Sequence, residues 1–188
     1  MFSSSEQSNS PTTLQGKLLI ADPCLRDSQF HKSVVLINQH NPDQGAMGLI
    51  LNLPTGRVVG DLLSDPIFDP LRKLAVHDGG PVEQDQLTFS SFWWGEENEL
   101  RWAVRITAEA AAQHLKIPGR LVRAYIGYSS WVTGQLENEL KGSSWFPVTP
   151  DPDLLGQPHN KALWSTLLGD ISPMHRILAE APNNPELN

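Results

Sequence analysis

The sequence predicts an α+β fold in which strands come first and helices gather toward the C-terminus. Short apolar runs rich in β-branched residues fill most of the first two-thirds of the chain, and the longer helical patterns follow. Strands and helices do not alternate regularly, which disfavours a parallel α/β architecture. A chain of 188 residues is the usual size of one domain.

Eight segments have the composition of strands, each bounded by turn residues. They are Lys17–Ala21, Ser33–Ile37, Ala46–Asn52, Leu74–His77, Gln86–Phe92, Leu100–Ile106, Leu121–Ile126 and Trp145–Val148. The turn-forming residues 41–45 predict a hairpin between the second and third segments. Gly48 has no side chain to pack and predicts a bulge or a close backbone neighbour.

Helices are predicted where capping and breaking residues frame good helix formers. The predicted helices are Val58–Leu63, a segment from Thr107 to Pro118, a segment through Leu136 and Leu140 ending near Gly142, Lys161–Leu168, and Ser172–Ala179. We expect residues 14–181 to form one domain around a single hydrophobic interior. Residues 1–13 form a disordered lead-in in this prediction, and residues 182–188 a frayed end.

Composition narrows the class of protein. The net charge of −7, with Lys and Arg scattered, disfavours direct binding to nucleic acid. Cys24 is the single cysteine, which excludes an intrachain disulfide and fits a cytoplasmic protein. No apolar run approaches the ~20 residues of a membrane helix, so we expect no membrane span.

The segment Gly127–Trp131 resembles the nucleophile elbow of hydrolases, G-x-S-x-G, but Trp131 stands where that tight turn needs a small residue. His31, His40 and His77 lack the spacing that would force them together on a metal. Cys24 follows Pro23, and Arg26 is close to it in sequence, so a reactive thiol at Cys24 is one open interpretation. No sequence signature of a catalytic cysteine supports it. We therefore predict no catalytic residue, no metal and no cofactor, and lean toward a protein that is not an enzyme.

Two other features are candidates for binding. Gly79 and Gly80 precede Pro81 and fit either a sharp strand exit or the backbone of a small-ligand cleft. Gln135 and Glu137 lie at the start of a predicted helix. Their side chains either belong to its solvated face or contact a ligand.

Phe92, Trp93 and Trp94 are consecutive aromatic residues in a predicted strand. Neighbouring side chains of a strand point to opposite faces. At least one ring of the three is therefore expected at a groove, a partner or a covering loop.

Five segments together resemble the YqgE/AlgH family. They contain Leu14, Gly16–Ala21 and Pro23; Phe30 and Ser33–Leu36; His40, Gly45–Asn52 and Pro54; Gly79–Val82; and Gly127, Tyr128, Trp131, Gly134–Glu137 and Glu139. The chain departs from the family at Gln39, where Glu is frequent, and at Ser129-Ser130, where Ala-Gly is frequent. The resemblance implies a bifurcated, mostly antiparallel β-sheet forming a pseudo-barrel flanked by helices. It implies no particular chemistry, although the family is similar in name to proposed regulators of exopolysaccharide synthesis.

Three functional hypotheses remain open. The first is a non-enzymatic regulatory or interaction protein, such as an indirectly acting transcriptional regulator, with Phe92, Trp93 and Trp94 meeting an unknown protein partner. The second is a small-molecule-binding protein or enzyme whose cleft gathers residues from distant motifs, namely His40, Asn52, Gly79, Gly80, Gln135 and Glu137. The third is direct DNA regulation. The oligomeric state is left open.

Overall fold

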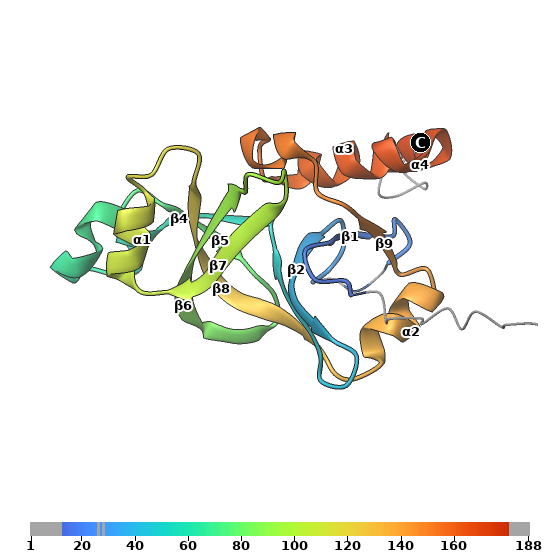
Figure 1. The fold of residues 1–188 in the computed structure, drawn as a ribbon, viewed down its shortest axis with the longest axis horizontal. Helices are drawn as coiled ribbons and strands as arrows, with labels where there is room; N and C mark the ends of the chain where they lie inside the picture. Colours follow the sequence, from blue (N-terminus) through green and yellow to red (C-terminus); the bar gives the residue numbers. More distant parts are fainter. Residues whose placement is uncertain (1–12, 26, 28, 181–188) are drawn as a thin grey trace, which may run out of the picture.

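The computed structural model describes residues 13–25, 27 and 29–180 and shows a single α+β domain (Figure 1). A mixed sheet curls into a half-barrel with helices around it, so the predicted fold class is confirmed. Two predicted segments lie outside the described residues. They are the lead-in at residues 1–13, except for Thr13, and the frayed end at residues 182–188.

Nine strands of the described residues form the sheet. They are β1 (Leu18–Ala21), β2 (Val34–Asn41), β3 (Gly45–Ile50), β4 (Pro54–Val58), β5 (Ala75–Asp78), β6 (Val82–Trp94), β7 (Leu100–Ile106), β8 (Leu121–Trp131) and β9 (Trp145–Val148). The hairpin predicted at residues 41–45 joins β2 to β3.

Four α-helices occur in the part of the chain that the structure describes: α1 (Ala108–His114), α2 (Gln135–Lys141), α3 (Lys161–Ile171) and α4 (Pro173–Glu180). Three 3₁₀ turns complete the described elements: η1 (Val59–Asp61), η2 (Pro66–Leu71) and η3 (Pro152–Gly156). Thr107 and Asn160 cap α1 and α3 with their side-chain oxygens, as predicted. The helices lie apart, with α1 at one end of the molecule and α2 and α4 toward the other (Figure 1).

Strand β8 branches the sheet. The order is β4-β5-β8-β3-β2-β1-β9, and β6 pairs with both β8 and β7. The first half of β8 runs parallel to β5, and its last residues run antiparallel to β3. The long strand thus passes from one part of the sheet to the other, which is what bifurcates it.

Glycines permit this branch, because two backbones meet there with no room for a Cβ atom. A Cβ at Gly79 would stand closer than 3.0 Å to the Gly127 carbonyl oxygen, and one at Gly127 would clash in the same way with the Gly80 oxygen. Gly127 also has a φ of +69°, a conformation that other residues rarely adopt. Larger residues at these positions could not keep the two backbones this close together.

Buried side chains form two clusters, so the expectation of a single interior is wrong. The larger cluster lies between β1, β2, β3, α2 and α3. The smaller one, around Phe89, Val122 and Ala124, is covered by η2 and α1. Alternate residues of β6 and β8 point to opposite faces, so these strands supply both clusters and hold them in one domain.

Three predicted elements need correction. Val58–Leu63 is not a helix: residues 54–58 pair with β5 as strand β4, and only Val59–Asp61 forms a 3₁₀ turn. The strand predicted to end at Ile126 continues to Trp131, because β3 and β6 offer pairing partners beyond Gly127. Strand β6 also begins earlier than predicted, at Val82.

Candidate functional site

His40 and Glu137 are brought together by the docking of α2 against β3, the hairpin partner of β2. The backbone N–H of Leu14 donates to His40 Nδ1 (3.1 Å), so Nε2 carries the proton and donates to Glu137 Oε1 (2.8 Å). The His40 side chain is 3% exposed. The hydrogen bond from His40 holds the pKa of Glu137 below its usual value. Every polar atom of the imidazole is thereby used to hold neighbouring segments.

Glu139, on the same helix, binds two buried indole groups. Its Oε2 atom accepts hydrogen bonds from Nε1 of Trp131 and of Trp145, each at 2.8 Å. Gln135 donates from Nε2 to Glu139 Oε1 (2.9 Å) and accepts from the Val132 N–H. These contacts anchor α2 to the ends of β8 and β9.

Replacing Glu139 with alanine should lower the free energy of unfolding by about 3 kcal/mol, because two buried N–H donors lose their acceptor. Glu137→Ala removes one such acceptor and should cost about half as much. Urea denaturation of both variants measures the difference. Equal losses would contradict the assigned role of Glu139.

The remaining polar candidates also serve the fold. Asn52 is fully buried, where its Oδ1 accepts from the Val34 N–H (2.8 Å) and its Nδ2 donates to the Lys32 carbonyl. Gly79 and Gly80 lie at the sheet branch against Gly127–Ser129, and the Gly79 carbonyl accepts from Ser129 Oγ. Residues 50–53 are bonded to Asp78 and Gly79, so Asn52 lies in the segment beside the two glycines, whereas His40, Gln135 and Glu137 lie around α2. None of the six predicted ligand residues lines the cleft described below.

The aromatic run Phe92–Trp94 is largely covered. Phe92 is 1% exposed and packs in the larger cluster. The Arg120 guanidinium lies 4.1 Å from the centre of the half-buried Trp93 ring, and Trp94 packs against the larger cluster. The most exposed large apolar side chains in the described residues lie elsewhere, at Val132, Met174 and Ile177.

Ser129 lies within β8 rather than at a turn, and its buried hydroxyl is bonded to Gly79, so the elbow resemblance does not extend to the structure. Cys24 is exposed. The described part of the chain has no group of three or more His, Cys, Asp or Glu arranged to hold a metal ion. No helix in the same residues is long and apolar enough to cross a membrane.

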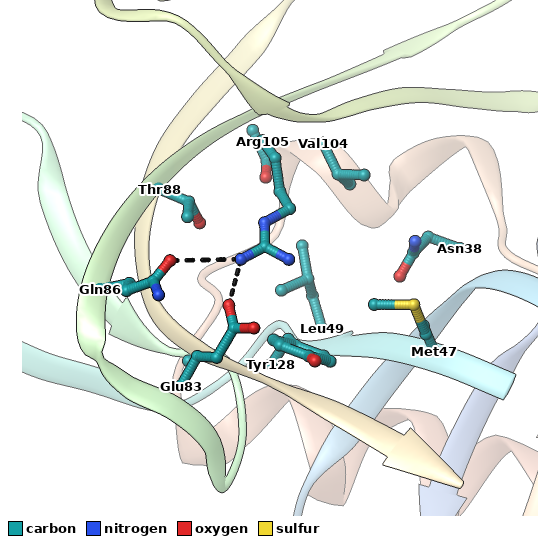
Figure 2. Close-up of a pocket in the computed structure, with 11 residues that line it drawn as sticks. Asn38, Met47, Leu49, Glu83, Gln86, Thr88, Val104, Arg105 and Tyr128 are labelled. Atoms are coloured by element: carbon teal, nitrogen blue, oxygen red, sulfur yellow. Dashed lines mark hydrogen bonds and ion pairs between the residues drawn. The ribbon is translucent and has the colours of Figure 1, made fainter. Parts of the chain in front are cut away.

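A cleft that the sequence did not predict lies between β2–β3 and β6–β7–β8 (Figure 2). Its apolar lining comes from Met47, Leu49, Val104 and Tyr128. The cavity volume is about 30 Å³. The empty space rises to about 380 Å³ when the open mouth of the cleft is included. The cleft is therefore narrow and suits a slender molecule.

Three irregularities of the sheet point side chains into this cleft. The β2–β3 register shifts at Asn38, the β6–β8 register shifts between Val82 and Leu87, and the β6–β7 register shifts opposite Ser90. The second shift contains Glu83 and the third contains Arg105, with φ values of +53° and +55°. Bulges commonly redirect side chains toward functional sites, and positive φ is costly for such residues.

A charged pair lies at the rim of the cleft. Arg105 donates from Nη2 to Glu83 Oε2 and, at 3.4 Å, to Gln86 Oε1 (Figure 2). The guanidinium carbon lies 5.3 Å from the centre of the Tyr128 ring. The Arg105 and Glu83 side chains are 45% and 36% exposed, so their ion pair contributes about 0–1 kcal/mol to stability.

Deeper in the cleft, Ser90 has a hydroxyl without a hydrogen-bond partner among the described residues, although the residue is 1% exposed. Native proteins pair most buried hydroxyls. The Ser90 oxygen is buried just behind the cleft wall, so a polar ligand atom would reach it with a small displacement of that wall. One sequence signal could have found this wall. Ser90 and Ser91 are consecutive small hydroxyl residues between Phe89 and Phe92, in a strand whose alternation is imperfect.

A second group of buried polar side chains lies where His159, in the segment after η3, approaches β5 and β8. Burial, followed by the charge of Arg123, lowers the pKa of His77 and of His159 to about 4. Arg123 donates to His77 Nε2, and burial raises the pKa of the neighbouring Tyr125 hydroxyl. These four residues are called the buried histidine cluster below.

The branched mixed sheet, curled into a half-barrel with a narrow cleft between its two parts, defines the class of protein. The family model described as AlgH-like matches residues 18–175, and the chain belongs to this family. The family resemblance read from the sequence is thereby confirmed.

Relatives and solved structures agree with this assignment. A UPF0301 protein of Streptomyces coelicolor is 32% identical over 94% of this chain and 96% of its own, and one of Thermobifida fusca is 30% identical over the same shares. The solution structure of the AlgH protein from Pseudomonas aeruginosa has a TM-score of 0.67 at 26% identity, covering 94% of this chain and 98% of that one. The crystal structure of protein DIP2367 from Corynebacterium diphtheriae has a TM-score of 0.70 at 21% identity, covering 89% and 92%, and bears on the fold alone.

Proposed function

We propose that this chain is a non-enzymatic regulatory protein that acts by binding a small organic molecule in the cleft between β2–β3 and β6–β7–β8. The observation that carries the proposal is the convergence of three register shifts of the sheet on one apolar cleft, whose wall holds the unpaired buried hydroxyl of Ser90.

The regulatory part of the proposal rests on how the chain uses its polar residues. His40, Glu139 and Asn52 are bonded to other protein groups in ways that hold the sheet and α2 together. Side chains committed to the fold in this way are poorly placed to exchange protons with a substrate. A cytoplasmic site of action, suggested by the single cysteine, belongs to the same proposal.

An interaction surface at Phe92, Trp93 and Trp94 has weaker support. The Phe92 ring is buried, and Arg120 covers one face of Trp93. Any partner would therefore meet only parts of Trp93 and Trp94, whereas interface anchors normally offer most of a ring to their partner. Indirect regulation through a protein partner remains compatible with ligand binding in the cleft.

The cleft is tested by filling it. In an NMR titration with 1-hexanol, we expect the amide signals of Leu49, Ser90 and Tyr128 to shift. Ser90→Val adds apolar volume to the wall and removes the unpaired hydroxyl, so the fold should persist while hexanol affinity falls about tenfold or more.

Ser91→Val is the matched control, because the neighbouring residue points to the opposite face of β6 and faces the smaller cluster. Its hexanol affinity should equal that of the wild type. Binding that is unaffected by Ser90→Val, or absent altogether from the cleft, would refute the proposal. Thermal melting of both variants shows whether each is folded.

A further inference from the structure

We infer that the ligand of this cleft is a slender organic monocarboxylate, whose acid group replaces Glu83 on Arg105 while its apolar tail enters between β3 and β6. This inference rests on the proposed function and deepens it by naming the ligand class. The ligand class follows from three features of the cleft: the charge at its rim, the apolar lining of its interior and its narrow width.

The rim presents a guanidinium that is already bonded to a carboxylate. Arg105 lies over the Tyr128 ring and is bonded to Glu83, with Gln86 as a weaker partner (Figure 2). Arginine offers a planar fork of N–H donors that matches a carboxylate in two places. The position of the Glu83 carboxylate therefore marks where the acid group of a ligand would bind.

The exchange of one carboxylate for another costs little here. Both partners of the ion pair are more than a third exposed, so Glu83 regains water when it leaves. Arg105 keeps its contact with Tyr128 and acquires an equivalent acceptor. An ammonium ligand would instead have to bind Glu83 close to the positive charge of Arg105, which repels it.

The interior selects the rest of the ligand. Leu49, Val104 and Met47 form an apolar lining, and none of the residues deeper than the rim carries a charge. Ser90 offers one unpaired hydroxyl, and the accessible space is narrow. A short unbranched tail, with room for one polar atom near Ser90, fits these conditions.

Three probes with the same six-carbon tail separate the contributions of charge: hexanoate, 1-hexanol and hexylamine. NMR titrations at pH 7.5 give the affinity of each for the wild type. We expect hexanoate to bind about tenfold more tightly than hexanol, and hexylamine to bind more weakly than either.

Three variants then assign the effect to Arg105. Arg105→Gln should abolish the preference for hexanoate over hexanol, and Glu83→Gln should raise hexanoate affinity severalfold because the competing carboxylate is gone. Arg101→Gln is the matched control, since Arg101 is on the same strand and is paired with Glu99 outside the cleft. It should bind all three probes as the wild type does.

The outcomes distinguish the two proposals. Equal binding of hexanoate and hexanol in the cleft, or a hexanoate preference that survives Arg105→Gln, overturns the carboxylate inference and leaves the cleft as a binding site. Preference for hexylamine overturns it as well and assigns the rim to cations. Failure of all three probes to bind in the cleft overturns the proposed function itself. If Arg105→Gln does not fold, the Glu83→Gln titration decides the inference alone.

Discussion

Replacing Gly127 with alanine is expected to lower the free energy of unfolding by about 4 kcal/mol, or to prevent folding. The added Cβ would stand closer than 3.0 Å to two carbonyl oxygens, those of Gly80 and Val82. Neither oxygen can withdraw without moving the backbone where β8 passes the end of β5. The left-handed conformation of the residue, φ +69°, adds its own cost for a side chain of about 1 kcal/mol.

Gly134→Ala separates the two costs. Gly134 has nearly the same backbone conformation, φ +75°, but a Cβ there would meet nothing within 4 Å. It should therefore lose only about 1 kcal/mol, which is the conformational part. Urea denaturation of the two variants gives the comparison. Similar losses at both positions would show that the backbone crossing at the sheet branch is not under the steric constraint described here.

Stability is also expected to fall in mild acid because of the buried histidine cluster. The pKa values of His77 and His159 lie at about 4 in the folded protein, against about 6.5 in an unfolded chain. Between these two pH values the unfolded state binds more protons, so the free energy of unfolding decreases as pH is lowered. From pH 7.5 to pH 5 each histidine should account for about 2 kcal/mol.

The double variant His77→Gln with His159→Gln should remove most of this dependence. Glutamine can accept the hydrogen bond from Arg123 at position 77 and donate to the Leu154 carbonyl at position 159, as the histidines do. His31→Gln is the control, because His31 is exposed and should leave the slope unchanged. Unfolding free energies measured at several pH values between 7.5 and 5 test this. An undiminished slope in the double variant would exclude the cluster as its source.

Local signals predicted much of the fold. The strands at Lys17–Ala21, Ser33–Ile37 and Leu100–Ile106 were predicted to within a few residues, and the caps Thr107 and Asn160 begin α1 and α3. The prediction went wrong at β4, where Pro54 and Gly56 indicate a turn when considered alone. Pairing with β5 extends that segment, and a pairing partner distant in sequence is not visible in local composition.

The candidate site was less predictable than the fold. The sequence identified His40, Glu137 and Gln135 as notable, and the structure shows them holding α2 against the sheet. The cleft went unnoticed because Asn38 and Glu83 fall outside the predicted strands, and Arg105 stands in a strand where polar side chains normally face water. Bulges reverse that expectation by changing which face a residue points to.

By itself, the sequence determined the class of fold, the family and most strand and helix positions. These follow from composition and short-range patterns, which act between residues that are close along the chain. Only the tertiary structure decided that β8 would be the strand that branches the sheet, that the interior would divide into two clusters, and that Arg105 and Glu83 would meet at the rim of a cleft. These features depend on the pairing register between distant strands, and a shift of one residue in that register sends a side chain to the other face.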